Sequence, residues 1–162
     1  MTDDSDLGRP DPARVVADAD VLTADLLVGG AAREAMDAIR AHSWVELVAS
    51  DPLLDDAEAV IRTCADDGLA RDWRERIETL RISVDHPPGD HPGLASAYQS
   101  NAAHLLSFDE TLTSAAAGSA LNRRLSLSIR TPDAFLSVFD PEKLYPVAVG
   151  GTYPGPDLDP RV

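Results

Sequence analysis

Short apolar runs alternate with longer segments of helical periodicity along residues 14–139. The short runs are typical of buried strands, and the longer segments are typical of amphipathic helices. The predicted strands are residues 14–17, 44–49, 81–84, 104–108 and 125–129. Because helices separate these strands, right-handed crossovers should join them into a mainly parallel sheet of about five strands that is covered on both faces.

The helices between these strands are marked by polar residues at their starts. Ser50 is a predicted N-cap and Pro52 stands in the first turn that follows. The helix over residues 53–65 is expected to bury a face that includes Val60 and Cys64. The other predicted helices are residues 20–28, 31–41, 69–80, 93–103, 110–117 and 133–139.

Composition divides the chain into three parts. Residues 1–13 are acidic and poor in apolar side chains, which predicts a flexible arm. Residues 14–139 form one predicted domain, and residues 140–162 are rich in proline and glycine and are expected to form a tail. The start is unlike a signal peptide, and no apolar run approaches the roughly 18 residues of a membrane span. We therefore expect a cytoplasmic protein without a membrane partner.

The charge balance is strongly acidic, with a formal net charge of -14. Lys143 is the only lysine, and the single cysteine, Cys64, excludes an intrachain disulfide and a cysteine-based zinc site. Such a carboxylate-rich surface indicates adaptation to molar salt. At about 1 M salt the Debye length falls to roughly 3 Å, so the negative charge does not exclude RNA as a partner.

Four aspartates stand where the predicted strands end or where the next helices begin. Asp18 ends the first strand and Asp109 follows the fourth, whereas Asp56 and Asp90 lie at the entries of the helices after the second and third strands. In an open α/β sheet these positions share one edge, where such folds bind ligands. Converging carboxylates repel one another unless cations neutralise them, and hard oxygen ligands select Mg²⁺ or Mn²⁺.

Several segments resemble, in the same order, the motifs of the PIN family of metal-dependent ribonucleases. VVADADVLTADLL is similar to the first motif, with its aspartate at Asp18 and with Asp20 where the family usually has asparagine. The second motif is similar to the segment SDPLLDDAEAVI, and its acidic residue corresponds to Asp56. The third and fourth motifs are similar to the segment GDHPGLASAYQSNAAHLLSFDETL, and their acidic residues correspond to Asp90 and Asp109. With the closing segment IRTPDAFLSVF, the resemblance covers roughly residues 14–139.

The resemblance implies a three-layer α/β/α PIN-like domain that hydrolyses RNA as a Mg²⁺- or Mn²⁺-dependent endoribonuclease. The four mapped aspartates would be catalytic and would hold one or two metal ions, Asp56 either directly or through water. Asp20 and Ser107 would have supporting roles. The enzyme would be a toxin or an RNA-processing ribonuclease, and the resemblance leaves open an antitoxin protein and a second copy of the chain as partners.

Some assignments in this site remain open. Asp55 competes with Asp56 for the inward position on its helix, and Asp85 competes with Asp90 in the loop before the fifth predicted helix. His91, beside Asp90, either faces the site or lies on the surface, and the surface is favoured. A basic cluster, Arg123, Arg124 and Arg130, either contacts phosphate or pairs with the many carboxylates.

Two other functions compete with a ribonuclease. One is a PIN-like domain that has lost activity and serves as an RNA-binding or assembly module. The other is a phosphoacceptor receiver domain, whose fold also places acids at strand ends. A receiver requires a lysine at the end of a late strand, and Lys143 lies in the predicted tail. The receiver is therefore disfavoured.

Overall fold

A five-stranded parallel sheet forms the centre of the protein, in a computed structural model that describes residues 9–114 and 127–161. The strand order is β3-β2-β1-β4-β5, and every neighbouring pair is parallel. The bounds are β1 Asp11–Ala17, β2 Glu46–Ala49, β3 Ile82–Ser83, β4 Ala102–Leu106 and β5 Ser128–Arg130. The prediction of a mainly parallel sheet of about five strands is confirmed.

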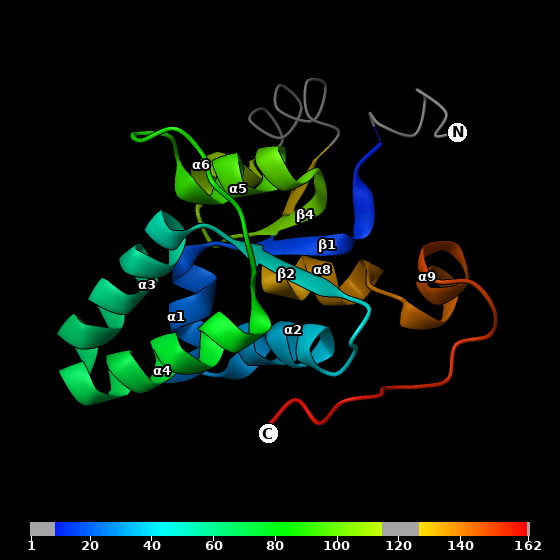
Figure 1. The fold of residues 1–162 in the computed structure, drawn as a ribbon, viewed down its shortest axis with the longest axis horizontal. Helices are drawn as coiled ribbons and strands as arrows, with labels where there is room; N and C mark the ends of the chain where they lie inside the picture. Colours follow the sequence, from blue (N-terminus) through cyan, green and yellow to red (C-terminus); the bar gives the residue numbers. More distant parts are fainter. Residues whose placement is uncertain (1–8, 115–126, 162) are drawn as a thin grey trace.

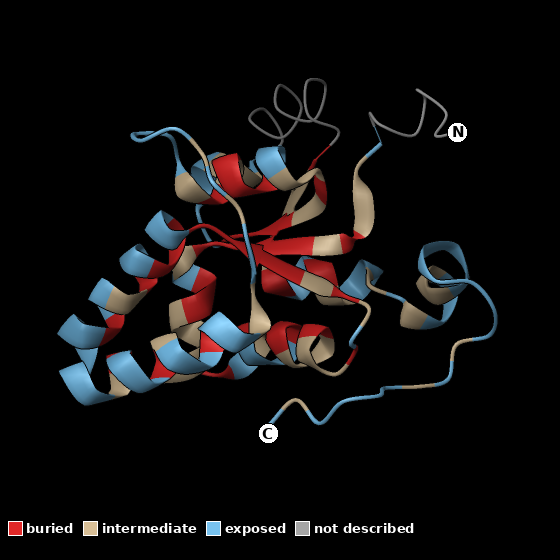
Figure 2. Cartoon of the chain, in the orientation of Figure 1, coloured by how far each residue is buried: buried red, intermediate tan, exposed pale blue. Residues whose placement is uncertain are grey.

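The two central strands supply much of the core because both of their faces are covered by helices. Val15, Val16, Leu105 and Leu106 are at most 1% exposed. Such continuous apolar runs are typical of parallel strands that are buried on both sides. Figure 2 shows this as a buried sheet surrounded by helices whose outer faces are exposed.

Helices lie on both sides of the sheet, which makes the domain a three-layer α/β/α sandwich, as predicted. Figure 1 shows α5 on one side of the sheet and α1, α2 and α8 on the other, with α3 and α4 packed together at the outer left. The helices in the described part of the chain are α1 Ala19–Leu27, α2 Gly30–Arg40, α3 Asp51–Cys64, α4 Asp67–Leu80, α5 Pro92–Ser100, α6 Glu110–Thr113, α8 Pro132–Val138 and α9 Pro141–Ala148. No helix in these ranges has the length and apolar character that crossing a membrane requires.

Local signals in the sequence explain several helix starts. Ser50 accepts a hydrogen bond from the backbone N–H of Leu53 and caps α3, and Thr131 caps α8 by accepting from Ala134. Pro52 and Pro132 stand in the first turns of these helices. Proline has no backbone N–H, and N–H groups in the first turn have no acceptor within the helix, so no hydrogen bond is lost there. The N-cap prediction for Ser50 is confirmed.

The structure differs from the sequence prediction in three elements. Strand β1 begins at Asp11, within the predicted arm of residues 1–13, because the backbone N–H of Asp11 donates to the carbonyl of Asn101 beside β4. Two residues of the predicted apolar face of α3 are not buried, because Val60 is 43% exposed and Cys64 is also exposed, whereas Ile61 is buried. Helix α9 was not predicted, since two prolines and exposed side chains hide its pattern. The chain after α9 has no regular structure, but it is tied to α2: the backbone N–H groups of Asp157 and Leu158 both donate to the carbonyl of Ala41.

Candidate functional site at the carboxyl edge of the sheet

Asp18 leaves the end of β1 and caps α1. One carboxylate oxygen, Oδ1, accepts a hydrogen bond from the backbone N–H of Ala19 at 3.0 Å. The other, Oδ2, accepts one from the hydroxyl of Ser107 at 3.0 Å. The residue is only 9% exposed. Asp18 is thus held at the sheet edge by a neighbour in sequence and by the end of another strand.

Ser107 connects the ends of the two central strands. It follows β4, is completely buried, and its hydroxyl accepts a hydrogen bond from the backbone N–H of Asp109 at 3.0 Å while it donates to Asp18. The backbone N–H of Asp18 donates to the carbonyl of Leu106 at 2.8 Å. Two candidate aspartates that are far apart in sequence are therefore joined through one serine side chain.

Asp20 lies in the same group, in the first turn of α1. Its Oδ2 accepts a hydrogen bond from the backbone N–H of Phe108 at 3.0 Å. Burial raises the pKa of Asp20 above its ordinary value, and the charges of Asp18 and Asp109 raise it further, against the lowering effect of its hydrogen bonds. The raised pKa means that a third negative charge at this edge is unfavourable unless a cation compensates it.

Asp109 begins α6 and is exposed. Its Oδ1 accepts hydrogen bonds from the hydroxyl of Thr111 and from the backbone N–H of Thr111, the latter at 2.9 Å. The hydroxyl bond, followed by the backbone bond, lowers the pKa of Asp109. Asp109 is therefore ionised, with its side chain turned to the first turn of α6.

The loop before α5 brings His91 to the site, rather than Asp90. Asp90 is exposed and makes no hydrogen bond or ion pair with any described residue. The Nε2 atom of His91 lies 3.8 Å from Oδ2 of Asp18, and its Nδ1 accepts from the backbone N–H of Leu94 to cap α5. His91 is exposed, as the favoured alternative has it, and its ring also lies beside Asp18, so the two alternatives do not exclude each other.

Gly93 lets α5 approach Asp18 closely. A Cβ atom at this position would lie 3.1 Å from Oδ1 of Asp18 and 3.3 Å from Cε1 of His91. Contacts that short are tighter than ordinary van der Waals packing. The glycine thus belongs to the site as a packing residue, a role that the sequence did not reveal, because Gly93 was predicted only as the start of the helix over residues 93–103.

Asp56 and Asp55 lie on different parts of the exposed surface of α3. Asp56 has no hydrogen bond or ion pair within the described chain. Asp55 pairs instead with Arg74 of α4, with 2.7 Å between Oδ1 and the guanidinium Nη1. Asp55 is therefore engaged by the neighbouring helix, which leaves Asp56 as the unpaired acid of the two. Asp85 is exposed and unpaired among the described residues.

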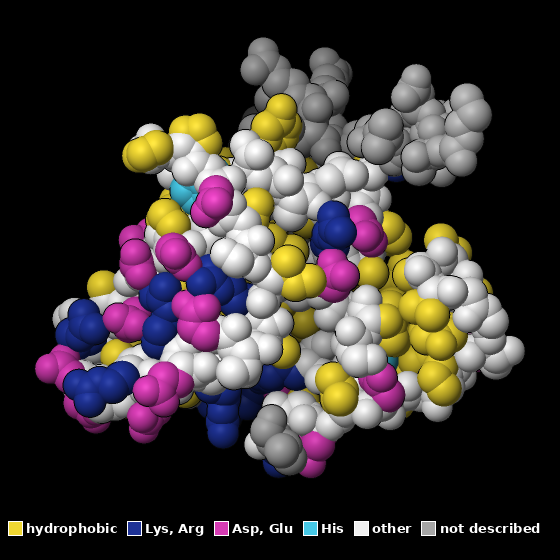
Figure 3. Space-filling view, viewed as in Figure 1, with side chains coloured by type: hydrophobic (Ala, Val, Ile, Leu, Met, Phe, Trp, Pro, Cys, Tyr) yellow, Lys and Arg dark blue, Asp and Glu magenta, His cyan; other side chains and the backbone are white. Residues whose placement is uncertain are grey.

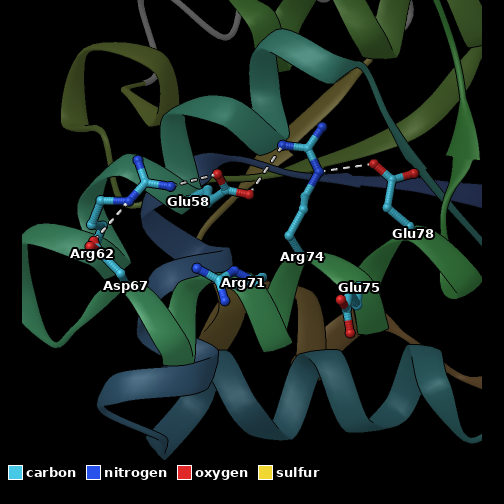
Figure 4. Close-up of a pocket in the computed structure, with 7 residues that line it drawn as sticks. All are labelled: Glu58, Arg62, Asp67, Arg71, Arg74, Glu75 and Glu78. Carbon is cyan, nitrogen blue, oxygen red and sulfur yellow. Dashed lines mark hydrogen bonds and ion pairs between the residues drawn. The ribbon is translucent and has the colours of Figure 1, made fainter.

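A groove between α3 and α4 is the most densely charged surface of this part of the molecule. Arg74 contacts Glu58 and Glu78, and Arg62 pairs with Glu58 and Asp67, from both helices (Figure 4). Figure 3 shows basic and acidic side chains interleaved over α3 and α4. Because these charges are paired with one another, the groove is a structural network rather than a ligand site.

Two of the other histidines are occupied by structural contacts. Nε2 of His86 lies 2.8 Å from the hydroxyl of Ser50, and the ring of His104 packs edge-on against Phe135. Burial, and then the charge of Arg130, lowers the pKa of His104 to about 4, so this imidazole is neutral near pH 7. Neither contact places these rings beside Asp18.

The charges at the sheet edge differ from those of the groove in having no arginine beside them. No described arginine or lysine forms an ion pair with Asp18, Asp20, Asp56, Asp90 or Asp109. Arg130 makes no ion pair with the described chain, and Arg123 and Arg124 lie outside the described residues.

The donors at this edge suit a hard divalent cation, although the described side chains do not form a complete ligand set. Asp18, Asp20, Asp109 and Ser107 offer only oxygen, which favours Mg²⁺ and Mn²⁺ over softer metals. Within the ranges that the structure describes, no three histidine, cysteine, aspartate or glutamate side chains are arranged to hold an ion. The donor chemistry fits, and binding would require the carboxylates to turn toward one another.

Comparisons with known proteins place the chain in a family but give no activity. The model of a family described as "Family of unknown function (DUF7384)" matches residues 9–161. Neither a search of curated proteins nor a search of solved structures found a match.

Proposed function

Because the chain belongs to the DUF7384 family, for which no function is known, we propose its function from the site and from the PIN resemblance of its sequence: a Mg²⁺- or Mn²⁺-dependent endoribonuclease that acts at the carboxyl edge of the sheet. One observation carries this proposal. The segment of Ser107, Phe108 and Asp109 bonds Asp18 through the serine hydroxyl and Asp20 through the backbone N–H of Phe108, and no described arginine or lysine pairs with the three aspartates. Uncompensated carboxylates at a ligand-binding edge are typical of sites that take a metal ion.

The side chains have distinct roles in this proposal. Asp18 and Asp109 would hold the ion, and Asp20 would add negative charge beside them. Ser107 positions both ligands, because its hydroxyl bonds Asp18 and its Oγ accepts from the backbone of Asp109. Asp90 and Asp56 have no competing partners in the described chain and are free to approach a bound ion or its waters.

A bound ion would supply an activated water and positive charge for a phosphodiester. The chain's own contribution is orientation. Hydrogen bonds from Ala19 and Ser107 occupy one lone pair on each oxygen of Asp18 and fix its plane, while Gly93 leaves room for that carboxylate against α5. His91, 3.8 Å from Asp18, is the nearest group that could exchange a proton at this edge.

RNA is the substrate that the PIN resemblance implies, and hydrolysis by water would leave a 5′-phosphate and a 3′-hydroxyl. The choice between a toxin and an RNA-processing enzyme belongs to the same proposal. An antitoxin protein and a second copy of the chain, as partners, belong to it too. The proposal also includes the adaptation of the acidic surface to molar salt, at which the repulsion between the protein and RNA would be screened.

Cleavage of labelled RNA in 1 M KCl with Mn²⁺ or Mg²⁺ tests the proposal. We expect cleavage by the wild type, its loss with EDTA, and a decrease of at least about 100-fold in Asp109→Asn, since a ligand matters at least as much as the outer-sphere residues whose loss costs 10–100-fold. Glu75→Gln is the matched control, because Glu75 is an exposed and unpaired acid of α4. Equal rates in the two variants would refute the site.

A second candidate is the inactive RNA-binding or assembly module. Thr111 favours it, because its two hydrogen bonds to Oδ1 of Asp109 already use one oxygen of this carboxylate as a helix cap. This module should bind RNA in the presence of EDTA as well as in Mn²⁺, and it should cleave none. Metal-dependent cleavage would eliminate it.

A further inference from the structure

A cavity of about 690 Å³ lies at the opposite end of α1 from Asp18. It is lined by the last turn of α1, by α2 and α4, and by residues 157–161 of the C-terminal segment. Figure 1 shows this segment running beneath α2 and α4 to the C-terminus. Cavities of roughly 300–1,000 Å³ are the usual size for small-molecule sites. None of the acids of the sheet edge lines it.

The cavity has an apolar wall. Leu26 comes from α1, Trp73 and Ile77 come from α4, and Leu158 comes from the C-terminal segment. Trp73 is 7% exposed and Leu158 is 48% exposed. An indole ring beside aliphatic side chains offers a surface for an aromatic or aliphatic group.

The polar side of the cavity carries arginines without carboxylate partners. Arg33, Arg76 and Arg161 line it, and none of them forms an ion pair within the described chain. Arg33 is directed by hydrogen bonds from its guanidinium to the backbone carbonyls of Asp25 and Leu26. Four aspartates, Asp25, Asp37, Asp157 and Asp159, line the cavity as well, so the charges of its lining balance. These carboxylates have other partners, because Asp25 and Asp37 pair with Arg40, and Asp157 and Asp159 accept hydrogen bonds from backbone N–H groups.

A fourth arginine adds an unused donor at the same place. Arg40 pairs with Asp25 and Asp37, but its Nε–H is buried with no acceptor. A buried donor without a partner is costly, and bound ligands are one way in which such donors are satisfied.

The wall formed by the C-terminal segment is held in place before any ligand binds. Both carboxylate oxygens of Asp157 accept hydrogen bonds from Ser43, from its backbone N–H at 2.9 Å and from its hydroxyl. The backbone bonds to Ala41 add two more attachments. The cavity is therefore preformed, which reduces the ordering cost of binding.

We propose that this cavity binds a small amphipathic anion, with an apolar ring against Trp73 and Leu26 and a phosphate or carboxylate on Arg76, Arg161 and Arg33. Guanidinium groups bind both anions through charge-assisted, often bidentate hydrogen bonds. Neither the apolar ring nor the anionic group of such a ligand would by itself contact both the apolar wall and the arginines of the cavity. The ligand should therefore require both the apolar group and the charge.

The probe for this proposal is 1-naphthyl phosphate, titrated in 1 M KCl while the indole N–H signal of Trp73 is followed by NMR. Trp44→Phe identifies which of the two indole signals belongs to Trp73. We expect a saturable shift with the probe, and binding at least ten times weaker for 1-naphthol and for inorganic phosphate. Absence of a saturable shift at millimolar probe, or equal binding of 1-naphthol, would overturn the proposal.

Two matched variants localise the binding. Arg76→Gln combined with Arg161→Gln should weaken binding of 1-naphthyl phosphate at least tenfold, whereas Arg71→Gln should leave it unchanged. Arg71 is an equally unpaired arginine of α4, but it lines the α3–α4 groove instead of this cavity. Both substitutions are expected to leave the fold intact, since these side chains are exposed. An equal loss in the Arg71 variant would contradict the assignment.

Discussion

Carboxylates crowd two regions of this protein, and the regions differ in what compensates them. In the α3–α4 groove, Arg74 contacts Asp51, Asp55, Glu58 and Glu78, with nitrogen–oxygen distances of 2.7–3.7 Å. At the sheet edge the acids contact hydroxyls, backbone N–H groups and His91, but no described arginine. The difference separates a network that compensates its own charge from a group of acids that no described arginine or lysine compensates.

One acid from each region, Asp20 and Glu78, has a pKa shifted in the opposite direction from the other, whereas Asp109 at the sheet edge has a lowered pKa because of its hydrogen bonds from Thr111. Hydrogen bonds from Arg74 and Arg81 lower the pKa of Glu78, whereas burial and the charge of Asp18 raise the pKa of Asp20. Folding thus favours the ionised form of Glu78 and disfavours the ionised form of Asp20. The sheet edge carries an electrostatic cost at neutral pH, and sites that bind ions commonly bear such a cost.

Substituting Asp55 and Asp56 of α3 one at a time should show that only one of them affects RNA cleavage. In the proposed enzyme, Asp56→Asn should slow RNA cleavage by about 10–100-fold, the usual cost of removing a group that acts on a metal through water. Asp55→Asn should cleave at the wild-type rate but lose the contact with Arg74 and unfold at a lower temperature. Rates and melting curves measured on both variants check this. Wild-type cleavage by Asp56→Asn would remove that residue from the site.

Removing the central cation of the groove should lower stability. Arg74→Gln leaves four acids without their shared partner and should reduce the free energy of unfolding by about 1–2 kcal/mol, more than a single exposed pair contributes. Arg71→Gln, an unpaired neighbour on the same helix, should change it by less than about 0.5 kcal/mol. Urea unfolding of both variants measures the difference, which should shrink as KCl is raised. An equal effect in the two variants would contradict the network.

Neutralising one acid in each region should change the melting temperature in opposite directions. In EDTA at pH 7, Asp20→Asn should raise it by on the order of 2 °C, because the raised pKa of Asp20 makes its ionised form unfavourable in the fold. Glu78→Gln should lower the melting temperature. Because the pKa of Glu78 is lowered from its ordinary value of 4.5, its ionised form stabilises the fold at pH values above 4.5, and this stability is lost as the pH falls through the lowered pKa. Differential scanning calorimetry measures both melting temperatures. A change of the same sign in the two variants would contradict the difference between the two regions.

The sequence predicted the layers and the sheet because strand burial and helix periodicity are local patterns. The ends of β1 and β4, and hence the places of Asp18 and Asp109, follow from the apolar runs that precede them. The role of Ser107 as a bridge and the nearness of His91 depend on contacts between segments far apart in the chain. Those contacts are set by packing, which no local pattern encodes.

The same limit explains what was missed around the site. Gly93 is required by the approach of α5 to Asp18, and that approach depends on where the whole helix packs. The pairing of Asp55, which leaves Asp56 unpaired in the described chain, depends on Arg74 of another helix. Exposure of Cys64 likewise follows from how far α3 extends beyond its neighbours, not from its spacing along the helix.

Calorimetric titration with Mn²⁺ tests most directly whether the sheet edge is a cation site. The account predicts saturable binding to the wild type and to Glu75→Gln, and its loss in Asp18→Asn, whose fold should remain intact because the amide can still cap α1. No binding by the wild type, or binding that is unchanged in Asp18→Asn, would contradict the central claim.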